Sequence, residues 1–406
     1  MTCEPQALAG IKVVEFGGYA AGPHIGKMLA NFGATVVHVE SHGRPDGFRL
    51  QYPPFKDGIA GANRGGCFAF FNDSKYGVTV DLKKAKGLEL ARRLTDWADL
   101  VVENMRPGVM ARIGLGYDEV RRTNPDLVML STCNMGQTGP RAQTPGFGSQ
   151  LSSLAGFCGT TGEPDGPPML LYGPYIDFIA SVMGCSAALA ALEQRRRTGS
   201  GTCIDLSQYE CGLHFMASAL LAYRRDGSVA GRNGNRDNTA APHGAYECQG
   251  GRWLALSCWS DAEFNALVAT LGCRGLAEDP RFAGMEARHD NVQTLDDALS
   301  EILSELDAEQ TAAALQGNGV RAYPVNTVAD LFGDPQLCER RSWRTRKHEE
   351  IGEQAYLMPG FDLSLTPGEV TRPAPLLGGD NDIVFKEFLG LSEDEFQACT
   401  AAGAFK

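Results

Sequence analysis

The first third of the chain alternates short runs of apolar, mostly β-branched residues with segments whose apolar positions repeat at a helical period. The pattern predicts strands over residues 11–16, 34–40, 78–82, 99–104 and 127–132, with helices over 23–31, 85–97 and 117–124 between them. Parallel strands joined by crossover helices build an open, doubly wound sheet. We therefore expect an α/β fold for this part of the chain.

The pattern changes in the middle of the chain. Residues 138–174 are dense in glycine and proline, which predicts loop structure. A long helix is predicted over 177–195; it ends in three consecutive arginines, which suit the carbonyl end of a helix dipole, and a strand over 203–206 follows. Beyond Arg224 a polar segment rich in glycine and asparagine indicates a linker. A second domain is expected to begin there.

The rest of the chain mixes strands and helices. The pattern predicts a hairpin over 244–259, helices that begin near Asp261, Ala287 and Ala308, a strand over 320–325, short strands near 342–348 and 355–359, and a final helical segment. The Asp334–Pro335 dipeptide separates the strand over 320–325 from the last two strands. No internal repeat is apparent in the sequence.

The composition is that of a folded globular protein, with 406 residues of which 43% are hydrophobic. A formal net charge of -12 disfavours nucleic acid as a partner, and an anionic ligand would need a focused basic pocket. No apolar stretch approaches the ~20 residues that span a bilayer, and residues 1–10 lack the features of a signal peptide. We therefore expect a cytoplasmic protein with no membrane partner.

The twelve cysteines include no CxxC pair and no zinc-ligand spacing, so we expect reduced thiols and no metal. The seven histidines form no triad or metal motif. His24 and His243 lie in loops flanked by glycine or proline and could reach a pocket, although such residues are more often solvated. The segment around Ser149 continues with Gln150 and Leu151, so the nucleophile elbow of serine hydrolases is absent.

A strand, a glycine turn, a helix and an acidic residue at the end of the next strand suggest a dinucleotide site, with Glu40 placed to bind a ribose. Gly17 and Gly22 would be the first and third glycines of the fingerprint, but Tyr19 occupies the middle position, where only glycine lets a pyrophosphate approach the backbone. Nicotinamide and flavin binding are therefore disfavoured. The helix that starts near Pro23 still presents unpaired N–H groups to an anion.

Asp177 stands alone among apolar residues at the start of the long helix. One interpretation is an N-cap, since aspartate is among the preferred capping residues. The other is a carboxylate nucleophile beside the N–H groups of the helix. With an unperturbed pKa of ~3.9, an aspartate is ionised at pH 7 and needs no histidine to activate it. Both interpretations stay open from the residues alone.

Several segments follow one another in an order that carries more information than any of them alone. They are residues 8–40, 70–83, 98–131, GQTGP (136–140), TGEPDGPP (161–168), YGPYIDF (172–178), RRRTGSGTCIDLS (195–207), DPRFAGMEARHDN (279–291) and LTPGEVTRPAPLLG (365–378). Together they resemble the class III CoA-transferases, the family that contains formyl-CoA, carnitine and bile-acid CoA-transferases. The resemblance covers nearly the whole chain.

The resemblance implies a fold and an assembly. A large Rossmann-like domain is built from both ends of the chain, here residues 1–224 and 334–406, and a smaller α+β domain, residues 225–333, is inserted between them. Two subunits of such proteins interlock like rings, so an interlocked homodimer is expected, with a heterodimer of paralogues as the other possibility.

The resemblance also implies the site. The family's catalytic aspartate falls on Asp177. CoA, bound as the acyl-CoA substrate, is expected at Ala20 and Ala21 after the first strand, at Lys75, and at Asn104, Met105, Arg106 and Arg112 around the VENMRPG turn. The lysine and the arginines would supply cations for its phosphates. The expected reaction moves CoA from an acyl-CoA to a carboxylic acid through an aspartyl anhydride and thioester, with no metal and with backbone N–H groups stabilising the oxyanions.

The chain departs from the family pattern at two places. Many members have Tyr-Asp where this chain has Phe147 and Gly148, and glutamine where it has Ser152, so polar contacts to substrate are expected to change. An arginine that often follows the glutamate of the second strand is replaced by Ser41, which removes one expected phosphate contact. Residues 146–168 look more like the branch that acts on aromatic or larger acids.

Two alternatives remain beside the CoA-transferase. A 2-methylacyl-CoA racemase of the same superfamily would use Asp177, but its histidine would fall at Phe147, which cannot act as a base. A CoA-binding subunit with little activity, which supports an active paralogue, is the non-enzymatic alternative; the presence of Asp177 argues against it, and Gly148 argues for it.

Overall fold

The computed structural model describes residues 6–406, and its contacts divide the chain into two compact units. The large unit comprises the chain up to Phe157, Leu170–Ser228 and Gln336–Lys406, and the small unit comprises Cys158–Met169 and Val229–Pro335. The first five residues of the predicted large domain lie outside the described residues. Each unit has its own sheet and its own hydrophobic core.

One segment belongs to a different unit from the one predicted. Residues 158–169 fall within the predicted large domain 1–224, but the structure places them in the small unit. The Gly234 N–H donates to the carbonyl of Gly162 at 2.9 Å, and the Arg232 guanidinium donates to the carbonyl of Glu163 at 3.2 Å. These bonds join two segments that are about 70 residues apart in the chain, which a local sequence pattern does not reveal.

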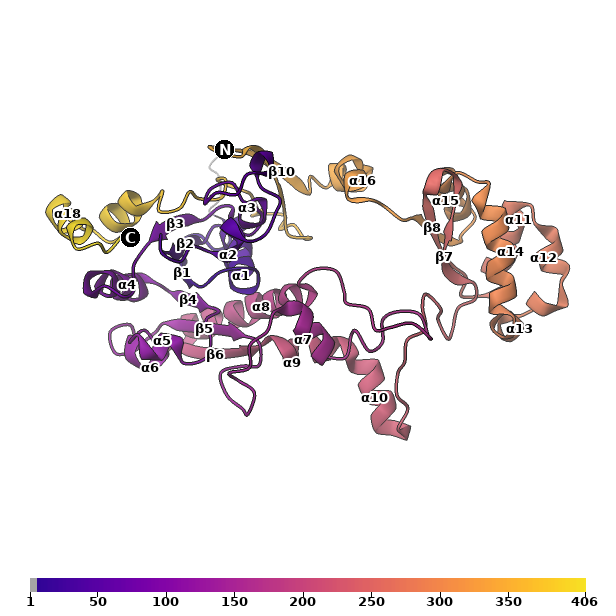
Figure 1. Ribbon diagram of the computed structural model, residues 1–406, viewed down its shortest axis with the longest axis horizontal. Coiled ribbons are helices and arrows are strands. Elements are labelled where there is room, and N and C mark those ends of the chain that lie inside the picture. The colour runs from indigo at the N-terminus through magenta and orange to yellow at the C-terminus, as the bar shows by residue number, and fades with distance from the viewer. Residues whose placement is uncertain (1–5) are drawn as a thin grey trace. The chain divides into compact units, whose positions relative to one another are not determined.

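The large unit is built around a six-stranded parallel sheet. Its strands are β1 (Lys12–Phe16), β2 (Thr35–Glu40), β3 (Tyr76–Thr79), β4 (Leu100–Glu103), β5 (Val128–Cys133) and β6 (Thr202–Ser207), in the order β3-β2-β1-β4-β5-β6 (Figure 1). All neighbouring strands run parallel. The order changes direction between β1 and β4, and open α/β sheets bind ligands at the carboxyl ends of the strands at such a switch point.

Helices cover both faces of this sheet. Val13 of β1 packs in one core with Ile25 of α1 (Ala21–Asn31) and Ala188 of α8 (Tyr175–Thr198). Its neighbour Val14 packs in the opposite core with Leu90 of α4 (Ala85–Trp97). Successive side chains of a strand point to opposite faces, so the unbroken β-branched run predicted as a strand is buried on both sides.

The end of the chain completes the core of the large unit. A π-helix (Ile383–Phe388) and α18 (Glu393–Ala401) pack in the same core as β3 and α4, and in Figure 1 this yellow segment lies beside them. The Gly77 N–H donates to Asp380 at 2.8 Å, and the Asp81 N–H donates to the carbonyl of Ala404 at 2.8 Å. Both ends of the described chain therefore build this unit.

Shorter elements complete the large unit. They are α2 (Gly47–Leu50), α3 (Gly66–Asn72), α5 (Val109–Arg112), α6 (Tyr117–Val120), α7 (Gly148–Leu154), α9 (Gln208–Leu213), α10 (Ala217–Asp226), the antiparallel pair β10 (Trp343–His348) and β11 (Gly352–Leu357), and 3-10 turns at Lys56–Gly58 and His214–Met216. The helix α17 (Pro335–Glu339) lies where the chain passes from the small unit to the large one.

The small unit packs helices on an antiparallel sheet of order β7-β8-β9. Its elements are β7 (His243–Glu247), β8 (Trp253–Ser257), β9 (Arg321–Pro324), α11 (Asp261–Leu271), α12 (Arg274–Glu278), α13 (Met285–Asp290), α14 (Val292–Ser304), α15 (Ala308–Gly317), α16 (Val328–Gly333) and 3-10 turns at Gln249–Gly251 and Pro280–Phe282. The predicted hairpin over 244–259 is confirmed, because β7 and β8 pair around a turn whose Gly250 has φ +69°. Leu254 and Leu295 lie in the hydrophobic core of the small unit.

Two predicted elements differ from the observed ones. The strand predicted over 78–82 is observed as β3 at Tyr76–Thr79, because from Asp81 onwards the backbone pairs with the end of the chain and not with β2. The helix predicted over 117–124 ends at Val120. Turns follow it, and the Asn124 amide donates to the carbonyl of Ala98 at 2.8 Å.

The helix α8 corrects the statement that no apolar stretch approaches a membrane-spanning length. Its 24 residues are long and apolar enough to cross a membrane by length and composition alone. The core helices of many globular proteins meet the same two criteria, and α8 packs against α1 and the sheet through Ile179, Ala188 and Leu192.

Candidate active site

Asp177 lies in the first turn of α8, three residues after the helix N-cap. Pro174 is the N-cap residue, and the Asp177 N–H donates to its carbonyl at 2.9 Å. Gly173, with φ +63°, makes the turn from which the helix starts. The N-cap interpretation of Asp177 is therefore wrong. The carboxylate is placed where the helix dipole favours negative charge.

A buried serine joins α8 to α1 next to Asp177. The Ser181 hydroxyl lies 2.7 Å from the carbonyl oxygen of Asp177 and 3.0 Å from that of Ala21. Further along α8, Gly184 permits the close approach of the two helices, because a Cβ there would lie 2.6 Å from Cδ1 of Ile25. The structure thus brings together Asp177 and Ala21, two of the predicted site residues.

Gly148, the first residue of α7, lies directly against the Asp177 carboxylate. A Cβ at position 148 would lie 2.0 Å from Oδ2 of Asp177, a separation that no real side chain tolerates. The sequence analysis treated Gly148 as the loss of a polar contact to substrate. In this structure Gly148 is required for steric reasons, because only glycine leaves room for the Asp177 carboxylate in its observed conformation.

Aromatic rings lie next to this contact. Phe147, which precedes Gly148, is 56% exposed, and its ring meets that of Tyr19 edge to face with centroids 5.7 Å apart. Tyr19 in turn contacts Phe48 and Tyr52 in the same manner, at 5.5 and 6.3 Å. Such edge-to-face contacts fix ring orientations. One border of the candidate site is therefore apolar.

Burial raises the pKa of Asp177 to about 7. Only its own backbone N–H acts in the opposite direction. This corrects the expectation of full ionisation at neutral pH, which assumed an exposed aspartate. A carboxylate with little solvation and no cationic partner is a stronger nucleophile once it is ionised, and perturbed pKa values of this kind are typical of functional sites.

The turn from Gly17 to Ala21 connects β1 to α1 and is held from two sides. The Asn104 side chain accepts the Gly18 N–H at 3.0 Å and donates to the Gly18 carbonyl at 2.7 Å. The Asp46 carboxylate accepts the Tyr19 N–H at 3.0 Å, which stabilises Tyr19 at φ +63°. Asn104 therefore shapes the turn through its side chain.

This turn carries two of the predicted CoA contacts. Ala20 and Ala21 are buried; Ala20 is the N-cap residue of α1 and Ala21 is its first residue. The next residue, Gly22, lies against the Asn104 side chain. Pro23 lacks an N–H, so the start of α1 has fewer donors than an ordinary helix. The remaining N–H groups lie at a helix N-terminus, a position suited to an anion.

Lys75 does not have the role that the sequence analysis gave it. The residue is fully buried, and its ammonium donates to Glu15 at 2.9 Å, to the carbonyl of Pro23 at 2.6 Å and to Asn72 at 2.9 Å. An ammonium has three protons, so none remains for a phosphate of CoA. Lys75 instead neutralises buried Glu15 and anchors the first turn of α1.

The other predicted cations remain available for a ligand. Arg106 and Arg112 are exposed on the segment that follows β4, and the Arg112 guanidinium lies against Gly108, which has φ +75°. Met105 is partly buried, and its N–H donates to Glu103 at 2.8 Å. No contact joins these residues to Asp177 in the described structure. Ser41 directly follows β2, and its hydroxyl accepts the N–H of Arg44 at 3.1 Å.

Two residues at this end of the sheet were not predicted as site residues. Burial raises the pKa of Glu103, which ends β4, to about 7. Burial, together with Lys27 and Lys75, lowers the pKa of His24 to about 3, so this imidazole is neutral at pH 7. Its Nδ1 is buried without a hydrogen-bond partner among the described residues. In the sequence, only its position next to Asn104 pointed to Glu103 as a site residue. For His24, the only indication was the glycine and proline beside it.

The chain belongs to the CoA-transferase family III, whose model matches residues 8–381. It is therefore an enzyme of the class that transfers CoA. This confirms the resemblance found in the sequence.

Individual relatives cover nearly the same length. The chain is 33% identical over 393 residues to a succinyl-CoA–D-citramalate CoA-transferase of Chloroflexus aurantiacus, which is 96% of each chain. It is 30% identical over 394 residues to the beta subunit of a succinyl-CoA–L-malate CoA-transferase of the same organism, covering 96% of this chain and 95% of the relative. A solved CAIB/BAIF family protein from Brucella suis has a TM-score of 0.87 and 31% identity, and covers 95% of this chain and 100% of that chain.

The raised pKa of Asp177 predicts a pH profile. A carboxylate that attacks a thioester must be ionised, so if Asp177 has this role the rate of CoA transfer should rise with pH through an apparent pKa of about 7 and fall about tenfold per unit below pH 6. The measurement is the initial rate of CoA transfer between pH 5 and 9 at saturating substrate. A rate that stays constant down to pH 5 would contradict the burial of an unpaired carboxylate.

The contact at Gly148 predicts the effect of a single methyl group. Gly148→Ala forces the Asp177 carboxylate to move, so kcat should fall roughly a hundredfold while the fold persists, because displacement by about 1 Å has this cost in other enzymes. The matched control is Gly146→Ala in the same loop, where the nearest neighbour of a new Cβ would be 3.4 Å away. Equal activity of both variants would show that Asp177 is not confined as described.

Lys75 and Arg112 should differ in what their loss affects. Lys75→Met removes the lysine ammonium from buried Glu15 and leaves it only the His38 ring at 3.2 Å, so it should lower the free energy of unfolding by about 3–5 kcal/mol. Arg112→Ala should leave stability unchanged and raise KM for acyl-CoA about ten- to a hundredfold if it binds phosphate. Urea unfolding and steady-state kinetics of both variants separate the two roles. An unchanged unfolding midpoint for Lys75→Met would restore Lys75 as a ligand residue.

Proposed function

We propose that this enzyme moves CoA between an acyl-CoA donor and a carboxylic acid acceptor through covalent intermediates on Asp177. The observation that carries the proposal is a buried carboxylate with a raised pKa in the first turn of α8, next to the start of α1, in a chain of the CoA-transferase family III. The large unit that carries it has the strand order of a Rossmann-like domain.

The reaction begins when an Asp177 carboxylate oxygen attacks the carbonyl carbon of the donor thioester. The carbon–sulfur bond breaks, CoA leaves as a thiolate, and a mixed anhydride links Asp177 to the donor acyl group. The thiolate then attacks Cγ of Asp177, which releases the donor as a carboxylate and leaves an aspartyl-CoA thioester. The acceptor carboxylate repeats these steps in reverse and leaves as its CoA thioester. Each step exchanges one acyl bond for another, so no net proton is consumed.

The surroundings of Asp177 suit these steps. Its burial excludes water, which would hydrolyse the anhydride. Backbone N–H groups at the starts of α1 and α7 are candidates to stabilise the tetrahedral oxyanions. Arg106 and Arg112 are candidate phosphate ligands for CoA because they are exposed cations at the carboxyl edge of the sheet.

For the acid pair, two observations support different substrates. The two relatives are named for succinyl-CoA with citramalate or malate, all small dicarboxylic acids. The rings of Phe147, Tyr19 and Tyr52 form an apolar border beside Gly148, which favours the aromatic or larger acid expected from residues 146–168. We propose succinyl-CoA as the donor to test first, with malate and phenyllactate as paired acceptors.

We further propose that a second subunit covers α10 and the outer face of α8. Leu220, Leu221 and Tyr223 of α10 are all exposed, the helix has no buried residue, and Figure 1 shows it projecting from the rest of the large unit. Val182 and Leu189 of α8 are exposed as well. Patches of this kind mark protein–protein contacts. An interlocked homodimer fits this surface, and the relative that is a beta subunit keeps a heterodimer of paralogues as the alternative.

The decisive experiment follows the oxygen atoms of Asp177. With an acceptor acid labelled with ¹⁸O in its carboxylate, each turnover should leave one labelled oxygen on Asp177, detected by mass spectrometry of the peptide that contains it. Incubation with acyl-CoA alone should form a CoA adduct on the same peptide that hydroxylamine removes. Asp177→Asn should lose several orders of magnitude in kcat, because an amide cannot form the anhydride.

Asp118→Asn, which changes an exposed aspartate of α6, is the matched control and should retain full activity. Transfer of CoA without label or adduct on Asp177 would exclude the covalent mechanism. Uptake of deuterium into a 2-methylacyl-CoA, with no adduct on Asp177, would favour the racemase instead.

A further inference from the structure

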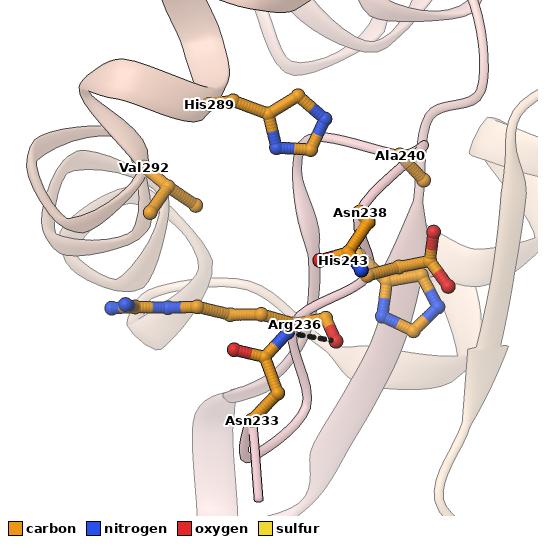
Figure 2. A pocket seen from close by; sticks show the side chains of 8 residues that line it. Asn233, Arg236, Asn238, Ala240, His243, His289 and Val292 are labelled. Atoms are coloured by element: carbon orange, nitrogen blue, oxygen red, sulfur yellow. Dashed lines mark hydrogen bonds between the residues drawn. The ribbon is translucent and has the colours of Figure 1, made fainter. Parts of the chain in front are cut away.

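The small unit contains a polar cavity that the proposed CoA transfer does not use. It measures about 150 Å³ and is smaller than the roughly 300–1,000 Å³ of sites for drug-sized ligands. The loop before β7 lines it with Asn233, Arg236, Asp237 and Asn238, and His243 and His289 complete its polar lining. In Figure 2 the His289 ring points from its helix towards the loop residues Asn238 and His243.

The loop that forms this cavity is held in place by its own hydrogen bonds. The Arg236 N–H donates to the carbonyl of Asn233 at 3.0 Å, and the Asn233 amide donates back to the carbonyl of Arg236 at 3.0 Å, the dashed bond in Figure 2. Buried Arg288 donates to the carbonyl of Ala241 at 2.8 Å, which ties the loop to α13. The cavity is therefore formed before any ligand binds, which lowers the entropic cost of binding.

Two side chains, His289 and Arg236, offer hydrogen-bond donors to the cavity. Nε2 of His289 is buried and has no partner among the residues that the structure describes. Nδ1 of His243 donates to the carbonyl of Asn235, and in a neutral imidazole the other nitrogen is then an acceptor, so His243 shapes the cavity and is not counted among its donors. The Arg236 guanidinium has five N–H groups, and one donates to Gln293 at 2.6 Å. These groups suit the oxygens of an anion.

Asp237 adds a second requirement for the ligand, which must also carry a hydrogen-bond donor. Its Oδ1 accepts both the N–H and the hydroxyl of Thr239 at 2.7 Å, and these bonds hold the pKa of Asp237 below its usual range. The carboxylate therefore stays ionised and repels an anion unless that anion brings a proton to it. A hydroxyl on the ligand would donate to the carboxylate, whereas an anion without one would place two like charges side by side with no proton between them.

We propose that this cavity binds a small oxyanion that also carries a hydroxyl group, with the anionic oxygens on Arg236 and His289 and the hydroxyl on Asp237. Hydrogen phosphate and the carboxylate of a 2-hydroxy acid share this chemistry. The site is independent of Asp177, and among the described residues no group of histidine, cysteine, aspartate and glutamate is arranged to hold a metal ion.

The test uses the full chain labelled with ¹⁵N in histidine, and follows the imidazole signals of His289 and His243 by NMR. Inorganic phosphate and lactate are the probes, and sulfate and propionate are their analogues without a hydroxyl donor. Phosphate, lactate or both should give saturable shifts, and the matching analogue should bind at least about tenfold more weakly, because sites built to accept a hydroxyl proton reject ligands without it. Saturation by phosphate alone identifies a phosphate ligand, and saturation by lactate alone a hydroxy acid.

Variants assign the two roles separately. Arg236→Gln should weaken the bound probe about tenfold or more, and Asp237→Asn should remove the preference over its analogue while Thr239 still holds the side chain. Arg274→Gln, an exposed arginine of α12 outside the cavity, is the matched control and should bind as the unaltered protein does.

If Asp237→Asn unfolds, the comparison of phosphate with sulfate on the unaltered chain still decides the hydroxyl requirement. The proposal fails if no probe saturates below about 50 mM, if sulfate and propionate bind as well as their partners, or if Arg236→Gln has no effect. Because the readout is the His289 signal and not CoA transfer, its failure would leave the proposed role of Asp177 unaffected.

Discussion

The Asp177 carboxylate occupies the space that any side chain at position 148 would need, and the candidate active site depends on this exclusion. Gly184 has the same effect about two turns further along α8 than Asp177, where the missing Cβ lets the helix approach Ile25 of α1. Ser181 then joins the two helices between these points. Two glycines and one hydroxyl thus place the proposed nucleophile of one helix beside the N-terminus of another, with no ion pair involved.

The buried charged residues near α1 and α8 are of two kinds, those that form ion pairs and Asp177, which does not. Beneath the β1–α1 turn, Lys75 pairs with Glu15 at 2.9 Å, Lys27 with Asp73 at 2.6 Å, and Arg49 with Glu40 at 2.7 Å, all of them buried. Buried pairs add little net stability, but the loss of one partner is expensive, so they fix the turn in a single geometry. Asp177 has no such partner, and its burial raises its pKa to about 7. The ion pairs therefore fix the conformation of the turn, whereas the Asp177 carboxylate is not neutralised by a cation.

The small unit shows that a polar cavity can be built beside a conventional apolar core. Leu254, Phe264 and Leu295 pack in that core. In the loop before β7, the Asn233 amide donates to the backbone carbonyl of Arg236, and the Arg236 guanidinium donates to the Gln293 side chain. Buried Arg288 links the two regions, since its guanidinium packs on Phe264 and donates to the loop at Ala241. An ordered loop of polar residues on a rigid core is a common setting for recognition of small ligands.

The sequence by itself determined the alternation of strands and helices in the large unit, because a strand buried on both faces and an amphipathic helix leave local signatures, as in Val13–Val14 and in α4. Asp177 also stood out, since a lone carboxylate in an apolar segment is conspicuous. The tertiary structure decided what these residues do. Lys75 and Arg112 are both cations in the sequence, but only packing by Glu15, Asn72 and Pro23 makes the first a buried anchor. Burial, charge and steric exclusion arise from segments far apart in the chain, so the pKa of Asp177 and the requirement for Gly148 could not be read from their neighbours in sequence.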